Sequence, residues 1–170
     1  VQDVCAAPGG KSFAAAIAME GEGQILSCDI HPHKLKLIDS GAKRLGISCL
    51  RTMLADAREH HAAWDRAADV VIADVPCSGL GIIRKKPDIR YKDPEELAQL
   101  PIIQREILEN VCRYVRSGGV LVYSTCTILP EENEQVTEAF LQAHPEFERT
   151  AFTLPLPIGS CDGQLTLWPQ

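Results

Sequence analysis

The chain of 170 residues has no apolar stretch of about 18 residues, the length that a membrane-spanning helix needs. It also has no charged-then-apolar leader, no internal repeat and no low-complexity segment. We therefore expect no membrane partner. Hydrophobic residues make up 45% of the chain, which favours a single globular domain with a packed core over residues 1–170.

A Cys-x-x-Cys pair, the usual signature of a protein zinc site, is absent, and we expect no metal. The seven cysteines are an odd number and are scattered, unlike the dense, even sets of small secreted disulfide proteins. A reducing cytoplasm is therefore the expected location. Most of the cysteines should pack there as small buried apolar side chains.

The segment Val4–Ser12, VCAAPGGKS, lacks one glycine of a phosphate-binding loop. It ends like the pattern G-x-x-x-x-G-K-[ST], but Cys5 stands where the first glycine is required. Without that glycine the backbone is less free to turn its N–H groups toward a phosphate. A nucleotide hydrolase is therefore disfavoured, and another ligand must explain the Gly9-Gly10 turn.

An excess of positive charge is also missing, because the formal net charge is −6. This argues against attachment to nucleic acid through overall charge. The segment 84–92, RKKPDIRYK, is a local exception with five basic residues and one acidic residue. It is either a solvated loop or a patch that holds a phosphate backbone. If it binds RNA, the expected contacts are Arg84, Lys85, Lys86 and Arg90.

Short apolar runs alternate with helical patterns along the chain. The expected strands are 1–5, 24–28, 49–53, 69–74, 120–125 and 147–152. The expected helices are 11–19, 33–45, about 94–116 (broken or kinked at Pro101 and closed by Gly118-Gly119) and 130–144. This alternation predicts an α/β fold with a mostly parallel sheet, helices on both faces and right-handed crossovers. A ligand should lie beyond the carboxyl ends of its strands.

Several polar or glycine-rich positions follow these strands and should meet at one edge. The Gly9-Gly10 turn lets a ligand approach the backbone closely, and Asp29 is placed to accept hydrogen bonds from the hydroxyls of a ribose. Asp56 is placed to contact an adenine amino group. Each aspartate alone could equally be a helix cap. Together with the glycine turn they predict a nucleoside ligand, and the absence of G-x-G-x-x-G disfavours a dinucleotide.

Cys77 and Cys126 follow two strands that a doubly wound sheet places side by side. A lone cysteine is usually inert packing, but two in polar loops at the binding edge indicate thiol chemistry. A thiolate that adds to carbon 6 of a cytosine makes carbon 5 nucleophilic toward a methyl donor, and a second acid–base group then aids release. Asp74 is placed to hydrogen-bond the base, and Lys11 or a helix N-terminus to activate a thiol. The base must come from a single strand or flip out of a helix.

Four segments, in order, resemble the Sun-type (Fmu) RNA cytosine-5 methyltransferases. They are DVCAAPGGKS (3–12), CDIHPHKL (28–35), ADVPCSGLGIIRKKPDIRY (73–91) and LVYSTCTILPEENE (121–134). The likeness runs from Val1 to about Ala143 and is strongest to bacterial members that modify small-subunit ribosomal RNA. It implies a Rossmann-like class I methyltransferase fold, S-adenosyl-L-methionine as methyl donor and ribosomal RNA as partner.

The resemblance also implies residue roles. Cys126 of the T-C motif is expected to be the nucleophile, Cys77 of the P-C motif to assist product release, and Asp74 and Lys11 to act beside the base and the donor. The residues expected to bind the cofactor are Cys5, Ala6, Ala7, Pro8, Gly9, Gly10, Lys11, Asp29, Lys34, Asp56, Ala57 and Asp74.

The chain departs from the family at both ends. Members carry an RNA-binding segment upstream and a final aromatic-rich strand, whereas this chain opens inside a strand and stops at QLTLWPQ. We therefore expect a catalytic-domain fragment without the final strand that methylates RNA poorly by itself. Two alternatives stay open: a non-catalytic module that binds cofactor or RNA, and a DNA cytosine methyltransferase, in which Cys77 would be the nucleophile.

Overall fold

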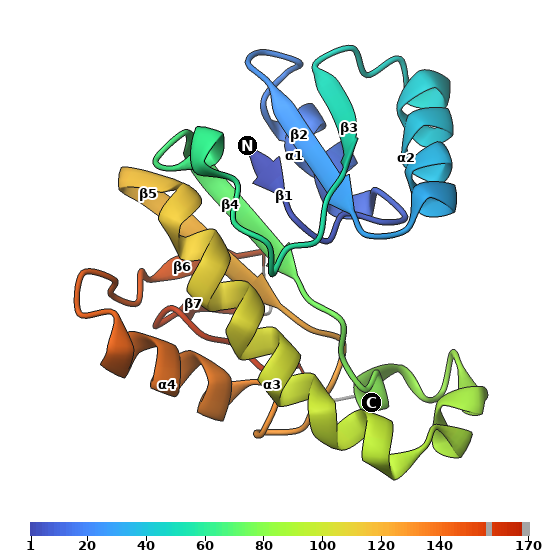
Figure 1. The fold of residues 1–170 in the computed structure, drawn as a ribbon, viewed down its shortest axis with the longest axis vertical. Helices are drawn as coiled ribbons and strands as arrows, with labels where there is room; N and C mark the ends of the chain where they lie inside the picture. The colour runs from blue at the N-terminus through green and yellow to red at the C-terminus, as the bar shows by residue number, and fades with distance from the viewer. Residues whose placement is uncertain (156–157, 168–170) are drawn as a thin grey trace. The chain divides into compact units, whose positions relative to one another are not determined.

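The computed structural model describes residues 1–155 and 158–167 (Figure 1). The chain divides into two compact units. The first, called the sheet unit, comprises Val1–Pro76 and Ile102–Thr125. The second, called the thiol unit, comprises Cys77–Pro101 and Cys126–Gln170. No helix within the described residues is both long and apolar enough to cross a membrane.

The sheet unit contains five parallel strands in the order β3-β2-β1-β4-β5. The strands are β1 (Gln2–Asp3), β2 (Ile25–Asp29), β3 (Leu50–Leu54), β4 (Ala68–Asp74) and β5 (Val115–Ser124). The order reverses between β1 and β4, which is where a doubly wound sheet binds its ligand. The predicted Rossmann-like fold is therefore confirmed, although β1 is shorter than the predicted strand 1–5.

Helices cover both faces of this sheet. Helix α1 (Gly10–Ala18) connects β1 to β2, and helix α2 (Pro32–Leu45) connects β2 to β3, the strand at one edge of the sheet. Helix α3 (Pro94–Val111) leads to β5, the strand at the other edge. Right-handed crossovers then place α3 on the opposite face from α1 and α2. In Figure 1, α1 lies behind the strands and the later part of α3 lies in front. Ile107, Leu108 and Val111 of α3 are buried in the core.

Helix α2 ends, and helix α3 begins, where the sequence predicts. Pro32 occupies the first turn of α2, and Gly46 ends that helix with φ 69°, a left-handed conformation that favours glycine. The carboxylate of Asp93 accepts the backbone N–H of Glu95 at 2.9 Å and so caps the start of α3.

Other predictions about α3 and β5 were wrong. Of the two outcomes predicted at Pro101, a break does not occur, because α3 is one helix from Pro94 to Val111. The buried apolar face beyond the proline compensates for the one hydrogen bond that proline removes. A short 3-10 turn, η4 (Cys112–Tyr114), follows, and β5 begins at Val115 rather than at Val120. Gly118 and Gly119 lie inside β5, at a shift in its register with β4, so they form a bulge and do not close a helix.

Irregular segments are more extensive in the described part of the thiol unit than in the sheet unit. The regular elements of the thiol unit are η2 (Leu80–Ile82), η3 (Pro87–Tyr91), the first part of α3 (residues 94–101), α4 (Glu134–Ala143), β6 (Phe152–Leu154) and β7 (Gly159–Cys161). The remaining short helix, η1 (Ala62–Trp64), belongs to the sheet unit. The predicted helix 130–144 starts only at Glu134, because residues 130–133 form a turn. The predicted strand 147–152 was misplaced, since β6 begins at Phe152 and pairs antiparallel with β7.

The sheet contains no final strand beyond β5 among residues 1–155 and 158–167. The stretch 164–167 is irregular, and the last three residues of QLTLWPQ lie outside the described residues. The expectation about the final strand therefore agrees with the part of the chain that the structure describes.

Candidate active site

The loop between β1 and α1 requires glycine at one position and is open at the next. Gly9 has φ 108°, and a Cβ there would lie 2.5 Å from the ring of Phe13. Any larger residue would therefore be strained and would clash. A Cβ on Gly10, the first residue of α1, would have no neighbour within 4 Å. The loop thus presents accessible backbone at the start of a helix, as a bound nucleoside needs.

A buried carboxylate supports this loop from beneath. Asp3 is fully buried, and its Oδ2 accepts a 2.7 Å hydrogen bond from Ser12 Oγ, which accepts one of 2.7 Å from Ser27 Oγ. Burial raises the pKa of Asp3 to about 6, although the Ser12 hydrogen bond opposes the rise. The three side chains join β1, α1 and β2. Asp3 is not among the predicted site residues.

Three predicted carboxylates of the sheet unit, Asp29, Asp56 and Asp74, lie near Cys5 of this loop. Asp29 ends β2, is 7% exposed, and accepts the backbone N–H of His31 at 2.9 Å. Burial raises the pKa of the Cys5 thiol to about 12, and the nearby carboxylates of Asp3, Asp29, Asp74 and Asp56 raise it further. These four groups therefore lie within electrostatic range of Cys5, so the convergence of strand ends is present. Lys34 is half-buried in the first turn of α2.

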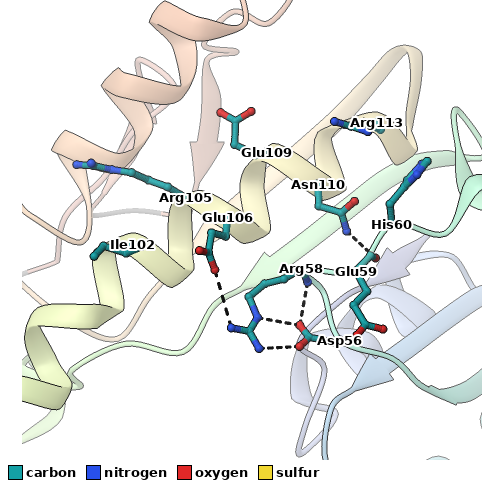
Figure 2. A pocket seen from close by; sticks show the side chains of 10 residues that line it. All are labelled: Asp56, Arg58, Glu59, His60, Ile102, Arg105, Glu106, Glu109, Asn110 and Arg113. Atoms are coloured by element: carbon teal, nitrogen blue, oxygen red, sulfur yellow. Dashed lines mark hydrogen bonds and ion pairs between the residues drawn. The ribbon is translucent and has the colours of Figure 1, made fainter.

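Asp56 is held by an arginine that sequence analysis did not single out. Arg58 donates to Asp56 through its backbone N–H (2.9 Å), Nε (3.1 Å) and Nη2 (2.7 Å). These contacts keep the pKa of Asp56 below its ordinary value, with the Arg58 side-chain hydrogen bonds as the largest cause. Figure 2 shows the guanidinium turned toward Asp56, with Glu106 of α3 3.9 Å from Nη1. The Asp56 carboxylate is therefore ionised and fixed in orientation.

An open pocket of about 710 Å³ adjoins this ion pair. It is lined by Asp56, Arg58, Glu59, His60, Ile102, Arg105, Glu106, Glu109, Asn110 and Arg113 (Figure 2). Asn110 Nδ2 donates to the carbonyls of Ala57 and Glu59, both at 2.8 Å, and so fixes the loop that follows β3 against α3.

Lys11 and Asp74, both among the predicted site residues, form an ion pair within the sheet unit. Lys11 Nζ lies 2.6 Å from Asp74 Oδ2, and Ser124 Oγ donates to Asp74 Oδ1 at 2.7 Å. Asp74 and Ser124 are paired in register at the ends of β4 and β5. Both Asp74 oxygens are thus oriented. Along the chain, Cys77 follows Asp74 by three residues and Cys126 follows Ser124 by two.

The two thiols face each other within the thiol unit. Cys77 Sγ lies 3.1 Å from Cys126 Sγ, and the backbone N–H of Cys126 donates to Cys77 Sγ at 3.2 Å. Burial, followed by the contact with Cys126, raises the pKa of Cys77 to about 12, so Cys77 is protonated at neutral pH. Cys126 is exposed. Cys126 is therefore accessible to a large substrate, whereas Cys77 is half-buried.

The basic segment has two different parts. The four predicted RNA contacts, Arg84, Lys85, Lys86 and Arg90, are exposed. Lys92 instead points into the loop that carries Cys77, where its Nζ donates to the carbonyl of Ser78 at 2.9 Å. Its charge therefore helps to hold this loop.

A family model described as 16S rRNA methyltransferase RsmB/F matches residues 1–170. The chain belongs to this family. It is 46% identical over 150 residues to a probable ribosomal RNA small subunit methyltransferase B of Bacillus subtilis, covering 87% of this chain and 34% of that protein. It is 38% identical to the corresponding Synechocystis protein, covering 99% of this chain and 39% of that one. The chain thus spans little more than a third of these relatives.

Solved structures agree with the RsmB/F assignment. PH0851 superimposes with a TM-score of 0.84 at 35% identity, over 92% of this chain and 35% of that chain. NSun6 from Pyrococcus horikoshii, a structure with SFG, superimposes with a TM-score of 0.71 at 29% identity, over 84% of this chain and 36% of that chain. Both are similar enough in sequence to support kinship as well as a shared fold.

The side chains of the site that the sequence of this RsmB/F member did not predict include Asp3, Arg58 and Glu132. Glu132 is 1% exposed and accepts the backbone N–H of Ser78 at 2.9 Å. The available signals were weak. Asp3 is the first residue of the DVCAAPGGKS segment, Arg58 lies two residues after Asp56, and Glu132 lies in the PEENE run, where the sequence predicts a helix.

Proposed function

We propose that this chain is the catalytic domain of an enzyme that methylates carbon 5 of a cytidine in small-subunit ribosomal RNA, with S-adenosyl-L-methionine as donor. The proposed route is a covalent adduct between Cys126 and carbon 6 of the base. Membership of the RsmB/F family supports the reaction class. The observation that carries the finer proposal is the 3.1 Å separation of Cys77 Sγ and Cys126 Sγ, with only Cys126 exposed.

The residues of the sheet unit fit the proposed donor. Accessible backbone at Gly10 suits a ligand that lies against the start of α1. The buried carboxylate of Asp29 suits ribose hydroxyls, and the ionised carboxylate of Asp56 suits the adenine amino group. Ala6, Ala7, Pro8, Lys34 and Ala57 are proposed to complete this set. S-adenosyl-L-methionine supplies an electrophilic methyl group when it is bound, and the related NSun6 structure is described as a complex with SFG.

Exposure distinguishes the two thiols. The exposed Cys126 can reach a splayed base, and as a thiolate its sulfur would form a bond to carbon 6. Cys77 is half-buried and protonated, so it does not compete as a nucleophile. This assignment of the nucleophile is the one expected for the RNA enzymes. In the DNA enzymes the P-C cysteine, here Cys77, would form the adduct instead.

Asp74 is proposed to bind the cytosine. Lys11 and Ser124 each hold one of its oxygens, so its remaining lone pairs have a fixed direction from which to accept the exocyclic amino group. Anchoring that edge would stabilise the ring when it has lost its aromatic double bond. Lys11 would balance the charge of Asp74.

Release completes the cycle. The proton on carbon 5 passes to a base, its electron pair restores the double bond between carbons 5 and 6, and the bond to Cys126 breaks with sulfur leaving as thiolate. Cys77 is proposed to assist this step, because its sulfur lies against that of Cys126 and can exchange a proton there.

The exposed cations Arg84, Lys85, Lys86 and Arg90 are proposed to hold the RNA backbone. A ribosomal substrate would place this activity in the cytoplasm.

The test uses the full-length protein, its RNA substrate and radiolabelled donor. Cys126→Ala should abolish methyl transfer and form no adduct, whereas Cys77→Ala should accumulate a covalent protein–RNA species because addition proceeds and release fails. Normal transfer by Cys126→Ala would refute the mechanism. Donor binding without any transfer by the wild-type protein would instead identify a non-catalytic module.

A further inference from the structure

We propose that Glu132 is a positioning residue that holds the loop of Cys77 against the loop of Cys126. This inference rests on the proposed function, since it gives Glu132 a part in product release. Glu132 lies in the turn before α4 and is 1% exposed.

The first contact fixes the residue next to Cys77. Glu132 Oε2 accepts the backbone N–H of Ser78 at 2.9 Å, while Lys92 Nζ donates to the carbonyl of the same residue at 2.9 Å. The Glu132 side chain therefore binds the peptide group between Cys77 and Ser78, and the Lys92 ammonium binds the peptide group between Ser78 and Gly79. Hydrogen bonds with one charged partner are among the stronger ones in proteins, so the backbone beside Cys77 is firmly held.

The second set of contacts fixes the residue next to Cys126. Ser78 Oγ lies 2.7 Å from Thr127 Oγ1, and the backbone N–H of Gly81 donates to the carbonyl of Cys126 at 3.1 Å. A Cβ on Gly81 would lie 2.9 Å from that carbonyl oxygen, so the two loops are in close contact there. Glu132 thus fixes Ser78, and Ser78 in turn is tied to Thr127.

The consequence is a fixed distance between the two sulfurs. Cys77 needs to remain beside Cys126 during release, whereas addition of Cys126 to a base does not require Cys77. Loss of the Glu132 contact should therefore impair release more than addition. It should also loosen the thiol pair in the absence of RNA and donor.

The first measurement is binding of phenylarsine oxide to the full-length protein, which requires two nearby thiols. The arsenical condenses with both thiols, forming two As–S bonds and releasing one water. The binding that is lost in Cys77→Ala is the part due to the pair Cys77 and Cys126. Glu132→Ala should weaken that part roughly tenfold or more, because a charge-assisted hydrogen bond is lost. Wild-type affinity in Glu132→Ala would overturn the proposal.

The second measurement is the partition between released methylated RNA and covalent adduct. Glu132→Ala should accumulate adduct, and Glu132→Gln, which keeps an acceptor oxygen for the Ser78 N–H, should restore much of the release. Glu131→Ala is the matched control, because this substitution removes the same side chain at an exposed neighbouring position. Equal partition in Glu132→Ala and Glu131→Ala would contradict a positioning role.

Two outcomes separate this proposal from the proposed function. If Cys126→Ala methylates RNA normally, the function fails, whatever the arsenical shows. If the function holds but Glu132→Ala binds arsenical and releases RNA like the wild type, only the positioning role fails. Should Glu132→Ala not fold, as judged by circular dichroism, Thr127→Val takes its place. It removes the hydroxyl bridge to Ser78, and unchanged arsenical binding there would overturn the proposal.

Discussion

The sheet unit and the thiol unit hold their chemical groups in different ways. In the sheet unit, Asp3, Asp29 and Asp74 lie at the ends of parallel strands, and Asp56 follows a fourth, so the sheet itself determines where they are. In the thiol unit, Cys77 and Cys126 lie in irregular loops. Hydrogen bonds from side chains to backbone determine where they lie. Cofactor binding should therefore depend on the fold, and thiol chemistry on a few contacts.

The largest expected effect separates the two units. Cys126→Ala should lower methyl transfer by at least roughly a thousandfold, because a nucleophile has no substitute. Affinity for S-adenosyl-L-methionine, measured by calorimetry on the full-length protein, should change less than about twofold, since Cys126 lies outside the sheet unit's proposed donor site. If Cys126→Ala also lost affinity for S-adenosyl-L-methionine, the proposed separation between donor binding by the sheet unit and thiol chemistry in the thiol unit would be wrong.

The next effect concerns stability of the sheet unit and its dependence on pH. The pKa of Asp3 rises from an ordinary value of 3.8 to about 6, so the folded state holds its proton more tightly than the unfolded chain does. Stability contributed by this group is complete below about pH 4, falls as pH rises toward 6, and is lost above that, by about 3 kcal/mol in all.

Asp3→Asn keeps an acceptor for Ser12 but cannot ionise, so the difference in unfolding free energy between variant and wild type should grow between pH 4 and 6. Urea titrations at several pH values measure it. Asp88→Asn, at an exposed position, is the control. A difference that stays constant with pH would show that Asp3 is not the titrating group.

A third prediction uses one glycine from each unit. Gly9→Ala should weaken donor binding by roughly thirtyfold, because its Cβ meets Phe13 at 2.5 Å in a left-handed backbone conformation. Gly81→Ala should leave donor binding nearly unchanged but slow methyl transfer, because its Cβ meets the carbonyl of Cys126 at 2.9 Å. Donor calorimetry and single-turnover transfer give the two readings. Similar donor affinities in both variants would remove the distinction.

The smallest expected effect is at Asp56. Arg58→Ala removes its side-chain donors, so the carboxylate loses its fixed orientation and donor affinity should fall roughly fivefold. Arg58→Lys should recover part of it, because lysine restores the charge but not the paired geometry. Arg51→Ala, at an exposed position in β3, should have no effect. Calorimetry measures the affinity of each variant for S-adenosyl-L-methionine. Wild-type affinity in Arg58→Ala would show that Asp56 is oriented without the Arg58 side chain.

Sequence patterns predicted the sheet unit better than the thiol unit for a physical reason. Buried parallel strands such as Ala68–Asp74 are continuous apolar runs, and helix ends such as Gly46 have local signatures. The wrong predictions in the sheet unit concern features that contacts between distant parts of the chain determine. Burial of the later part of α3 keeps it helical through Pro101, and pairing with β4 draws Gly118 and Gly119 into β5.

The thiol unit has no such periodicity. Motifs marked Cys77 and Cys126, and adjacency of β4 and β5 predicted that they face each other, which the 3.1 Å separation confirms. Glu132 and Lys92 gave no comparable signal, because their partners are backbone groups many residues away in sequence. A carboxylate or an ammonium in a polar loop looks solvated until the fold brings those groups to it.

The identity of the sulfur that bonds to RNA tests the account most directly. The covalent complex formed by the full-length Cys77→Ala protein can be digested and its cross-linked peptide identified by mass spectrometry, beside a wild-type complex trapped with 5-fluorocytidine RNA. We predict that the nucleotide is attached to Cys126 in both. Attachment to Cys77 in the wild-type complex would contradict the proposed roles of the two thiols.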